Sequence, residues 1–375
     1  MRVGIPTEIK DDEHRVAITP AGVAAFVARG HEVLIEAGAG VGSAIPDRAY
    51  REAGARLAGG PDDVWEQADL ILKVKEPLDP EFDRMRPGQI LFTYLHLAAS
   101  SALTARLLDR RIVGIGYETV QLDDGTLPLL VPMSEVAGRL SIQAGAASLE
   151  RHAGGKGLLL PGVSGVRRGR VTILGAGVVG MNACVVAAGF GAEVTIIDIN
   201  PLRLGYVRDV LQGHVNTLMS NAANIEGAVA SADLVLCSVL IPGARTPRLV
   251  TRAHLKQMEP GSALVDVAVD QGGCAETSRP TTHTNPRYVD EGVVHYCVSN
   301  MPGAVPHTST YALTNATMTY ALEIADRGWR AAAERDPALA RGVNLVDGQV
   351  THAAVAAAHD LDAAPLKGQR ARPAL

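Results

Sequence analysis

The sequence contains little cysteine and no long apolar segment. Four cysteines occur in 375 residues, far apart and without a CxxC pair: Cys184, Cys237, Cys274 and Cys297. This spacing is typical of reduced thiols in a cytoplasmic protein, and not of a disulfide framework or a zinc site. No run of about 18 consecutive apolar residues is present, so we expect no membrane-spanning helix. The segment MRVGIPTEIKDDE has no basic stretch followed by an apolar one, and no secretory signal is expected from it.

The sequence also lacks an excess of basic residues. Lysine and arginine total 35, aspartate and glutamate total 40, and the net charge is −5. Nucleic acids and anionic membranes are bound by basic patches, so neither is an expected partner. Apolar residues make up 47 % and charged residues 20 %, as in globular proteins with a buried core. At roughly 100–200 residues per domain, the length favours two domains.

The first third of the chain alternates short β-rich runs with helical segments. The Thr19-Pro20 pair predicts a helix start, because threonine is a favourable N-cap and proline suits the first helical position. Gly30 predicts the end of that helix. Strands separated by helices imply parallel βαβ units with right-handed crossovers, hence a doubly wound α/β domain. The expected strands are residues 2–6, 32–36, 70–75, 89–95 and 112–117.

A second α/β series follows a long helix expected from Ser134 to about His152. Pro302 and Pro306 interrupt the pattern, and a further helix is expected at 308–328. We therefore predict a discontinuous first domain, 1–128 plus 306–375, into which a Rossmann domain, 129–305, is inserted. The last dozen residues have no periodicity and are expected to form a loose tail. The expected strands of the inserted domain are residues 170–174, 193–198, 234–238, 263–269 and 293–298.

The segment RVTILGAGVVGMNACVVAAGFGAEVTIIDIN indicates a dinucleotide site. Gly175, Gly177 and Gly180 follow a β-rich run and match G-x-G-x-x-G, in which the glycines allow a tight turn, approach of the pyrophosphate and close helix packing. A second β run ends in Asp198, eighteen residues after Gly180, where a carboxylate accepts ribose hydroxyls. An acid there repels a 2′-phosphate, so NAD is favoured over NADP. A glycine turn without a ligand is the alternative.

A second glycine cluster, in EVLIEAGAGVGSAIP, does not match this pattern. Gly38, Gly40 and Gly42 follow a strand, but Ser43 occupies the position of the third glycine and no helix starts promptly. This segment is predicted to be a structural loop.

Four reactive side chains lie at or near strand ends, where open α/β sheets bind ligands. Lys75, His96 and Asp270 end expected strands, and Arg15 lies in the loop after the first. Together they supply two cations for a small carboxylate, an imidazole that exchanges protons near neutral pH, and a carboxylate. Each has another interpretation. Lys75 could be a solvated strand end like Lys73, His96 a core histidine, Asp270 a turn former and Arg15 a surface charge.

Two further carboxylates indicate structure and not chemistry. Glu118 also follows a strand and is interpreted as a structural hydrogen-bond partner. Glu323 and Arg327 have the four-residue spacing of a helical ion pair. No metal site is predicted.

Seven segments resemble bacterial alanine dehydrogenases: MRVGIPTEIK, EHRVAITP, ILKVKEPL, LFTYLHLA, PMSEVAGRL, DQGGCAETSRPTTH and NMPGAVPHTSTYALTNAT. The resemblance runs from Met1 to about Ala340. It implies two α/β domains flanking a cleft and the reversible NAD-linked oxidative deamination of L-alanine to pyruvate and ammonia. It also implies a cytoplasmic homohexamer.

The resemblance assigns Arg15 and Lys75 to the substrate carboxylate and carbonyl side, and His96 and Asp270 to an acid/base pair. Tyr94 and Met133 are expected to limit the size of the pocket, which should then prefer a methyl side chain. Some family members have a histidine four residues after the acid at 323, but this chain has Arg327, so a metal pair is not expected. The expected cofactor residues are Ser134, Gly175, Gly177, Val178, Val179, Gly180, Asp198, Arg203, Ser220, Val239, Leu240, Val267, Ala268, Val269, Asp270, Arg279, Val298, Ser299, Asn300 and Met301.

Two other functions remain open at this stage. The related nicotinamide nucleotide transhydrogenase α subunit shares much of the fold, and would pass hydride to a partner protein and not to alanine. An opine-type or saccharopine-type reductase would need a second amino acid in place of ammonia.

Overall fold

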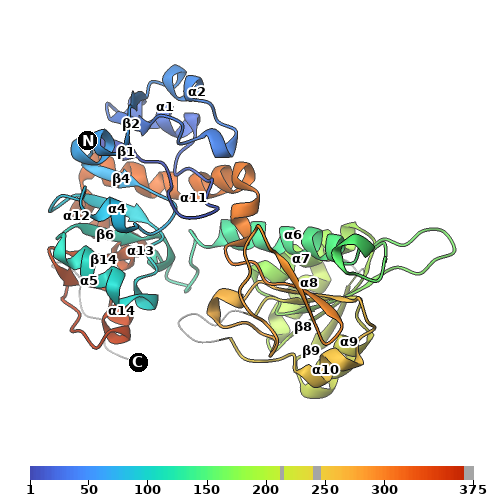
Figure 1. The fold of residues 1–375 in the computed structure, drawn as a ribbon. Helices are drawn as coiled ribbons and strands as arrows, with labels where there is room; N and C mark the ends of the chain where they lie inside the picture. Colours follow the sequence, from blue (N-terminus) through green and yellow to red (C-terminus); the bar gives the residue numbers. More distant parts are fainter. Residues whose placement is uncertain (212–214, 240–245, 367–375) are drawn as a thin grey trace. The chain divides into compact units, whose positions relative to one another are not determined.

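The chain forms two compact units in the computed structural model, which describes residues 1–211, 215–239 and 246–366 (Figure 1). The first unit comprises Met1–Met133 and the C-terminal part from Val305, and the second comprises Ser134–Ala304. The expected boundaries differ from this division by at most five residues. Within the described ranges, every helix is too short or too polar to cross a membrane.

The first unit contains an eight-stranded sheet in the order β15-β14-β6-β5-β4-β1-β2-β3. Six strands are parallel, and β14 and β15 add an antiparallel edge. The strands are β1 (Arg2–Ile5), β2 (Glu32–Glu36), β3 (Arg56–Ala58), β4 (Leu70–Leu72), β5 (Ile90–Thr93), β6 (Val113–Gly116), β14 (Val343–Val346) and β15 (Gln349–Val350).

The helices of this unit follow local capping signals in several places. The Thr19 side chain accepts a hydrogen bond from the Gly22 N–H at 3.3 Å, and Gly30 has a φ of +79°, so the expected start and end of the first helix are confirmed. The helices are α1 (Pro20–Ala28), α2 (Asp47–Glu52), α3 (Pro61–Gln67), α4 (Asp79–Phe82), α5 (Ser101–Asp109), α11 (Pro306–Arg327), α12 (Trp329–Arg335), α13 (Pro337–Gly342) and α14 (Ala353–Ala358).

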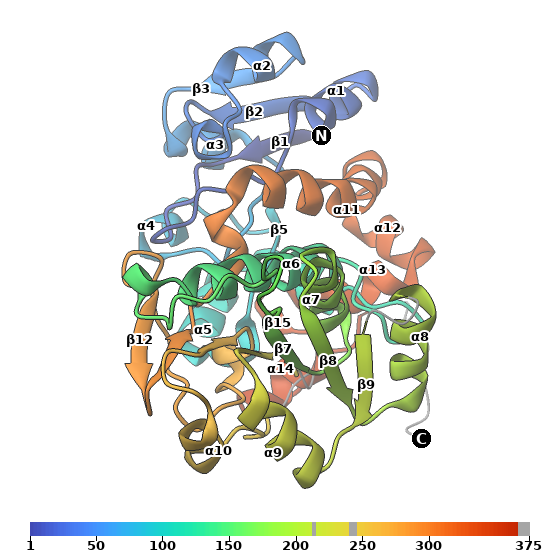
Figure 2. The ribbon, with the colours of Figure 1, turned by 90° about the vertical axis from the view of Figure 1, so that its right-hand side faces the viewer.

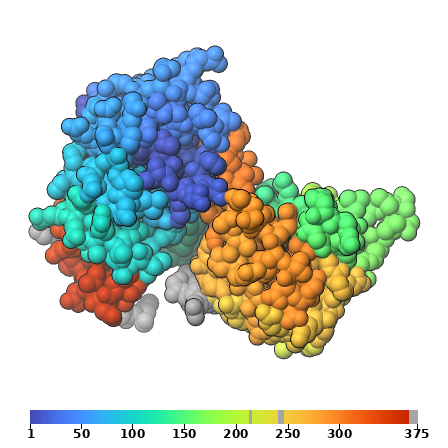
Figure 3. All heavy atoms as spheres, viewed as in Figure 1, coloured from blue at the N-terminus to red at the C-terminus, as the bar shows by residue number. Residues whose placement is uncertain are grey.

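One core of this unit joins residues from both ends of the chain. Trp65 of α3, Ile71 of β4 and Leu91 of β5 are buried with Leu345 of β14 and Val355 of α14. Burial of such side chains is the main stabilising contribution to a fold. The C-terminal segment is therefore part of the first unit, as the red atoms beside the cyan ones show in Figure 3.

The second unit contains a seven-stranded sheet in the order β12-β13-β11-β10-β7-β8-β9, parallel except for β12. Figure 2 shows β7, β8 and β9 side by side. The strands are β7 (Arg170–Leu174), β8 (Glu193–Asp198), β9 (Val215–Met219), β10 (Leu234–Cys237), β11 (Ala263–Asp266), β12 (Arg287–Asp290) and β13 (Val293–Tyr296). The helices are α6 (Val131–Ser148), α7 (Val178–Gly189), α8 (Pro201–Leu211), α9 (Ala222–Ser231) and α10 (Arg252–Gln257).

The α/β fold class is confirmed, but several element bounds were wrong. The strand expected at 70–75 ends at Leu72, and the strand expected at 263–269 ends at Asp266. The long helix begins at Val131 and ends at Ser148. Strands β3, β9, β12, β14 and β15 were missed, because they are short or lie at sheet edges, where one face stays partly exposed and the apolar alternation is weak.

Candidate active site

Each sheet, taken by itself, has a strand order that creates a binding position at the carboxyl ends of its strands. Ordered from β3, the parallel strands of the first unit run β3-β2-β1-β4-β5-β6, and those of the second run β9-β8-β7-β10-β11-β13. In the first unit, the chain continues from β1 to β2 and β3 on one side and then to β4 on the other side, so the direction of the connections reverses between β1 and β4. In the second unit, it reverses in the same way between β7 and β10. Ligands of open α/β sheets bind beyond the carboxyl ends of the strands at such a switch point.

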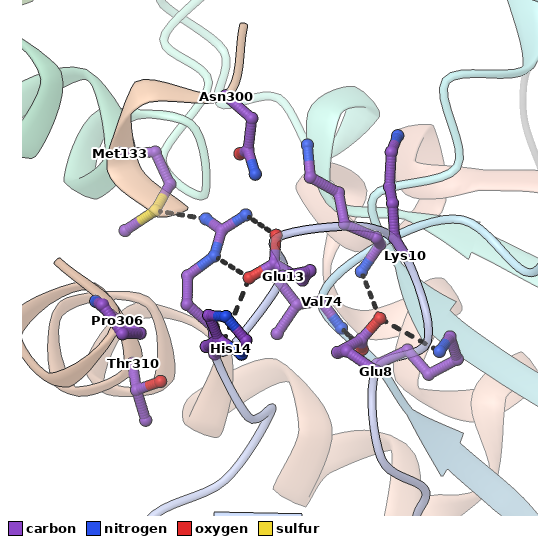
Figure 4. A network of polar contacts seen from close by, with 12 residues as sticks. Glu8, Lys10, Glu13, His14, Val74, Met133, Asn300, Pro306 and Thr310 are labelled. Atoms are coloured by element: carbon purple, nitrogen blue, oxygen red, sulfur yellow. Dashed lines mark hydrogen bonds and ion pairs between the residues drawn. The ribbon is translucent and has the colours of Figure 1, made fainter. Parts of the chain in front are cut away.

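Arg15 is buried in the loop after β1 and is not a surface charge. Its Nε donates to Glu13 Oε1 at 2.6 Å, its Nη2 donates to Glu13 Oε2 at 2.5 Å, and its Nη1 lies 3.0 Å from the Met133 sulfur (Figure 4). Burial disfavours the charged guanidinium, but the hydrogen bonds and charge of Glu13 outweigh burial, so the pKa of Arg15 is raised. Glu13 therefore binds the Nε–Nη2 edge of the Arg15 guanidinium. The sequence predicted a bidentate contact of Arg15 with the substrate and did not indicate Glu13 as its partner.

Lys75 lies three residues beyond the end of β4 and is half-buried. Its backbone carbonyl accepts a hydrogen bond from Thr93 Oγ1 at 3.0 Å, and no described residue forms an ion pair with its ammonium. Burial, followed by the positive charges of Arg15 and Lys10, lowers the pKa of Lys75. A substrate carboxylate beside this ammonium would offset both effects, so the position favours an anionic ligand.

His96 lies beyond β5 with a side chain 43 % exposed, so the interpretation as a core histidine was wrong. Its φ of +51° is unusual for a residue other than glycine. Glu118 holds this turn, because its Oε1 accepts the backbone N–H groups of His96 at 2.6 Å and of Leu95 at 3.1 Å. The structural role expected for Glu118 is confirmed.

Glu76 orients the imidazole of His96. Its Oε2 lies 3.1 Å from His96 Nδ1, and its Oε1 forms an ion pair with Lys10. Burial raises the pKa of Glu76, but the hydrogen bonds from His96 and Lys10 outweigh it and lower the pKa to about 2. The ionised carboxylate faces Nδ1 and leaves Nε2 for proton exchange. Tyr94 stacks on His96 with ring centroids 5.9 Å apart, and its hydroxyl donates to the Leu129 carbonyl at 2.6 Å.

A buried ion cluster supports the backbone of Lys75. Lys73 Nζ lies 3.0 Å from Glu8 Oε2 and 2.8 Å from Glu81 Oε1, and all three side chains are buried, so the interpretation of Lys73 as a solvated strand end was wrong. Glu8 Oε1 also accepts the Val74 N–H at 2.6 Å. Burial raises the pKa of Glu8. Sequence reasoning missed Glu8, although a buried lysine requires acidic partners.

The glycine turn of the second unit has the geometry of a phosphate cradle. Gly175 has a φ of +101°, and a Cβ on Gly180 would lie 1.8 Å from the Gly175 carbonyl oxygen. Gly177 caps α7 without a side-chain hydrogen bond, so the first-turn N–H groups face outward to an anion. The residues here fit a dinucleotide.

Asp198 ends β8 beside this turn. Its Oδ2 accepts the Ala176 N–H at 2.6 Å, and its Oδ1 accepts the Asn200 N–H at 2.7 Å. A carboxylate has about four acceptor positions, so ribose hydroxyls can still bind. Asp198 therefore also fixes the glycine turn, which the sequence did not indicate.

Asp270 lies in a 3-10 turn after β11 and does not end the strand. The loop that carries it is held by the buried Asp266, whose carboxylate accepts the N–H groups of Ala268 at 3.0 Å and Cys274 at 2.7 Å. Burial raises the pKa of Asp266. Asp270 Oδ2 accepts the Asn300 N–H at 3.4 Å, which links the two loops that carry many expected cofactor residues.

Most other expected cofactor residues follow strand ends of the same sheet. Ser220 follows β9 and donates its N–H to the Asp198 carbonyl at 2.9 Å, and Val239 follows β10. Arg203 is exposed on α8, Ser134 lies on α6, and the Arg279 guanidinium lies 4.2 Å from the Tyr288 ring centroid. Leu240 lies outside the described residues. The segments 267–270 and 298–301 follow β11 and β13, and Val178 and Val179 begin α7.

The expected ion pair between Glu323 and Arg327 is confirmed at 2.7 Å. Among the residues that the structure describes, no group of three or more histidine, cysteine, aspartate or glutamate side chains could hold a metal ion.

Comparisons with known proteins match nearly the whole chain. The family model "Alanine dehydrogenase/PNT, N-terminal domain" matches residues 4–137, and "Alanine dehydrogenase/PNT, C-terminal domain" matches 141–353. An alanine dehydrogenase of Methanococcus maripaludis is 57 % identical over 97 % of this chain and 98 % of its own length. One of Geobacillus stearothermophilus is 56 % identical over 96 % and 97 %.

Two solved structures have similar folds. An L-alanine dehydrogenase matches with a TM-score of 0.94 and 50 % identity, over 96 % of this chain and 99 % of that one. A transhydrogenase from Sinorhizobium meliloti matches with a TM-score of 0.81 and 26 % identity, over 94 % and 100 %.

Replacing Lys73 tests the buried ion cluster. Lys73→Met leaves Glu8 and Glu81 buried without a cation, and we expect a loss of about 3–5 kcal/mol in the free energy of unfolding measured by urea titration. Arg48→Met is the matched control, because Arg48 is 82 % exposed in its pair with Glu52 and its loss should cost less than about 1 kcal/mol. Equal stability of the two variants would contradict a structural role for the cluster.

Proposed function

The chain belongs to the alanine dehydrogenase/PNT family, and from this premise we propose which of its residues carry out the reaction. The chain catalyses the reversible NAD-dependent oxidative deamination of L-alanine to pyruvate and ammonia. The observation that carries this function is the 57 % identity to an alanine dehydrogenase over 97 % of the chain.

A transhydrogenase subunit is less well supported. The transhydrogenase structure is 26 % identical with a TM-score of 0.81, against 50 % and 0.94 for the L-alanine dehydrogenase. The opine-type and saccharopine-type alternatives gain no support from the comparisons reported above.

We assign substrate binding to the discontinuous domain 1–128 plus 306–375, and cofactor binding to the domain 129–305. The division of the chain into units that carry Arg15, Lys75 and His96 on one side and the glycine turn on the other supports this assignment. When bound, NAD supplies the acceptor for the hydride that leaves the alanine Cα. The cofactor residues that we propose are those implied by the family resemblance, together with Asp198 for the ribose and the glycine turn for the pyrophosphate, which the sequence motif indicates.

In the proposed mechanism, Arg15 and Lys75 hold the substrate carboxylate and polarise the carbonyl side of pyruvate. Glu13 fixes the guanidinium, and Glu8 fixes the backbone at Lys75. His96 exchanges a proton at Nε2, because Glu76 faces Nδ1. Asp270 is the second member of the acid/base pair, on a loop that Asp266 holds. The two groups move the protons that accompany addition of water and departure of ammonia.

A homohexamer and a cytoplasmic location are further proposals from the family resemblance. Exposed apolar side chains, among them Leu159, Val163 and Val166 at 60–62 % and Leu202 at 82 %, support assembly because other copies could cover them. A solution mass of six chains by light scattering would support the hexamer, and a monomeric mass would contradict it.

Four free, buried cysteines support a reducing compartment. Cell fractionation tests the location, and recovery of the chain outside the cytoplasm would contradict it.

The function predicts activity without a partner protein. With L-alanine and NAD, the purified chain should form NADH, which is measured by its absorbance. With pyruvate, ammonium and NADH, the chain should consume the NADH. A panel of small L-amino acids should show L-alanine as the preferred substrate. A chain that transfers hydride only when a second protein is added would favour the transhydrogenase alternative. Activity that requires a second amino acid in place of ammonium would favour the reductases.

His96→Ala and Asp270→Asn should each lower turnover in both directions by about 10²–10⁴-fold, because general acid–base groups contribute in this range. NADH binding, measured by fluorescence, should stay close to normal in the His96 variant. The double variant should lose less than the product of the two single losses. If the variants instead melt at lower temperature while activity per folded chain persists, the two residues are structural.

Glu76→Gln should lower kcat for alanine deamination, because a neutral amide replaces the ionised carboxylate, with a pKa of about 2, that orients the His96 ring. We expect a loss of about tenfold or more, since hydrogen bonds to charged groups contribute about 1.5–3 kcal/mol. Glu52→Gln, an exposed change on α2, is the control and should leave kcat in place. An unchanged kcat in the Glu76→Gln variant would rule out this role.

A further inference from the structure

The two units repeat one arrangement of strands. Each sheet has six parallel strands whose spatial order is third, second, first, fourth, fifth and sixth along the unit. In each, the last residue of the first strand pairs with the penultimate residue of the second strand, so the two registers are the same. The helix after the third strand begins three residues beyond that strand in both units.

The repeat places an acidic residue at the same point of both sheets. Asp198 ends the second strand of the second unit, and Glu36 ends the second strand of the first unit. Asp198 accepts the N–H of Ala176 at 2.6 Å, and Glu36 Oε2 accepts the N–H of Thr7 at 2.9 Å. Ala176 and Thr7 are each the second residue beyond the first strand. Glu36 is therefore the counterpart of the residue to which we assign the cofactor ribose.

A cavity of about 360 Å³ lies beside Glu36. Its walls come from the segment after β1, the end of β2, the start of α3 and the segment after β4. The first three places correspond to Ala176, Asp198 and Ala222 of the second unit, and Asp198 is the residue to which we assign the ribose of the cofactor. The lining includes Glu36 and the apolar Pro6, Ile9, Pro61, Leu78 and Pro80. The charged Glu81 and Arg84 also line it, and they form ion pairs with Lys73 and Asp62.

We propose that this cavity is a second ligand site, which binds a purine nucleoside through its base and ribose. The apolar side chains hold the faces of the base, and Glu36 accepts the ribose hydroxyls, because apolar pockets with a few placed polar groups bind such ligands. The proposal rests on the proposed role of Asp198, from which the role of Glu36 is inferred.

The geometry limits the ligand to a nucleoside. The volume is near the lower end of the roughly 300–1,000 Å³ of ligand pockets, which suits a nucleoside better than a dinucleotide. The segment between β1 and α1 contains no glycine, and the Thr19 side chain already accepts a first-turn N–H of α1 from Gly22. The cradle that holds a pyrophosphate in the second unit is therefore missing from the first.

The test uses the full chain saturated with NADH, which fills the cofactor site whichever residues hold it. Equilibrium dialysis with radiolabelled adenosine should then find one adenosine bound per chain. Adenosine should bind at least tenfold more tightly than 2′,3′-dideoxyadenosine, because the latter lacks the hydroxyls. Glu36→Gln should weaken adenosine binding and reduce this preference. Glu52→Gln makes the same chemical change at an exposed position of α2 and should change neither.

A second variant fills the cavity without altering Glu36. Ile9 is 46 % exposed, and Ile9→Trp should block adenosine binding while NADH binding is retained. Absence of adenosine binding to the NADH-saturated chain, or binding that neither Glu36→Gln nor Ile9→Trp changes, would overturn the proposal. NADH binding that survives Asp198→Ala would overturn the cofactor assignment, and the adenosine measurement separates this failure from that of the cavity.

Discussion

The proposed site depends on carboxylates that accept backbone N–H groups at strand ends. Where a chain leaves a sheet, its N–H groups lose their ladder partners and need other acceptors. Glu8 accepts those of Val74 and Lys75, and Glu118 accepts those of Leu95 and His96. Hydrogen bonds to an ionised acceptor are shorter and stronger than neutral ones, so each carboxylate fixes the backbone of a residue to which we assign chemistry.

The second unit uses the same device. Asp198 holds the glycine turn through Ala176, and Asp266 holds both ends of the loop that carries Asp270. Such carboxylates are costly to bury, and burial raises the pKa values of Glu8 and Asp266. The unfavourable burial is offset differently for Glu8 and for Asp266. Lys73 supplies a cation to Glu8, whereas backbone N–H groups and the Ser278 hydroxyl surround Asp266.

The sequence predicted the features that depend on local patterns. The G-x-G-x-x-G run, the Thr19 cap and the position of Asp198 at the end of a strand are short-range signals, and the structure has each of them. Partners brought together by the fold were not predictable. The pairing of Lys73 with Glu8 joins residues 65 apart, and the contact of His96 with Glu76 depends on where β4 and β5 end. The edge strands were missed because partial exposure weakens their apolar pattern.

The most direct test is a crystal structure of the chain with NADH and pyruvate bound. We expect the pyruvate carboxylate within hydrogen-bond distance of Arg15 and Lys75, and the carbonyl oxygen near Nε2 of His96. We also expect NADH to bind with its pyrophosphate on the turn from Gly175 to Gly180. A pyruvate bound away from Arg15 and Lys75, with His96 and Asp270 contacting neither ligand, would contradict the assignment of the chemistry to these strand ends.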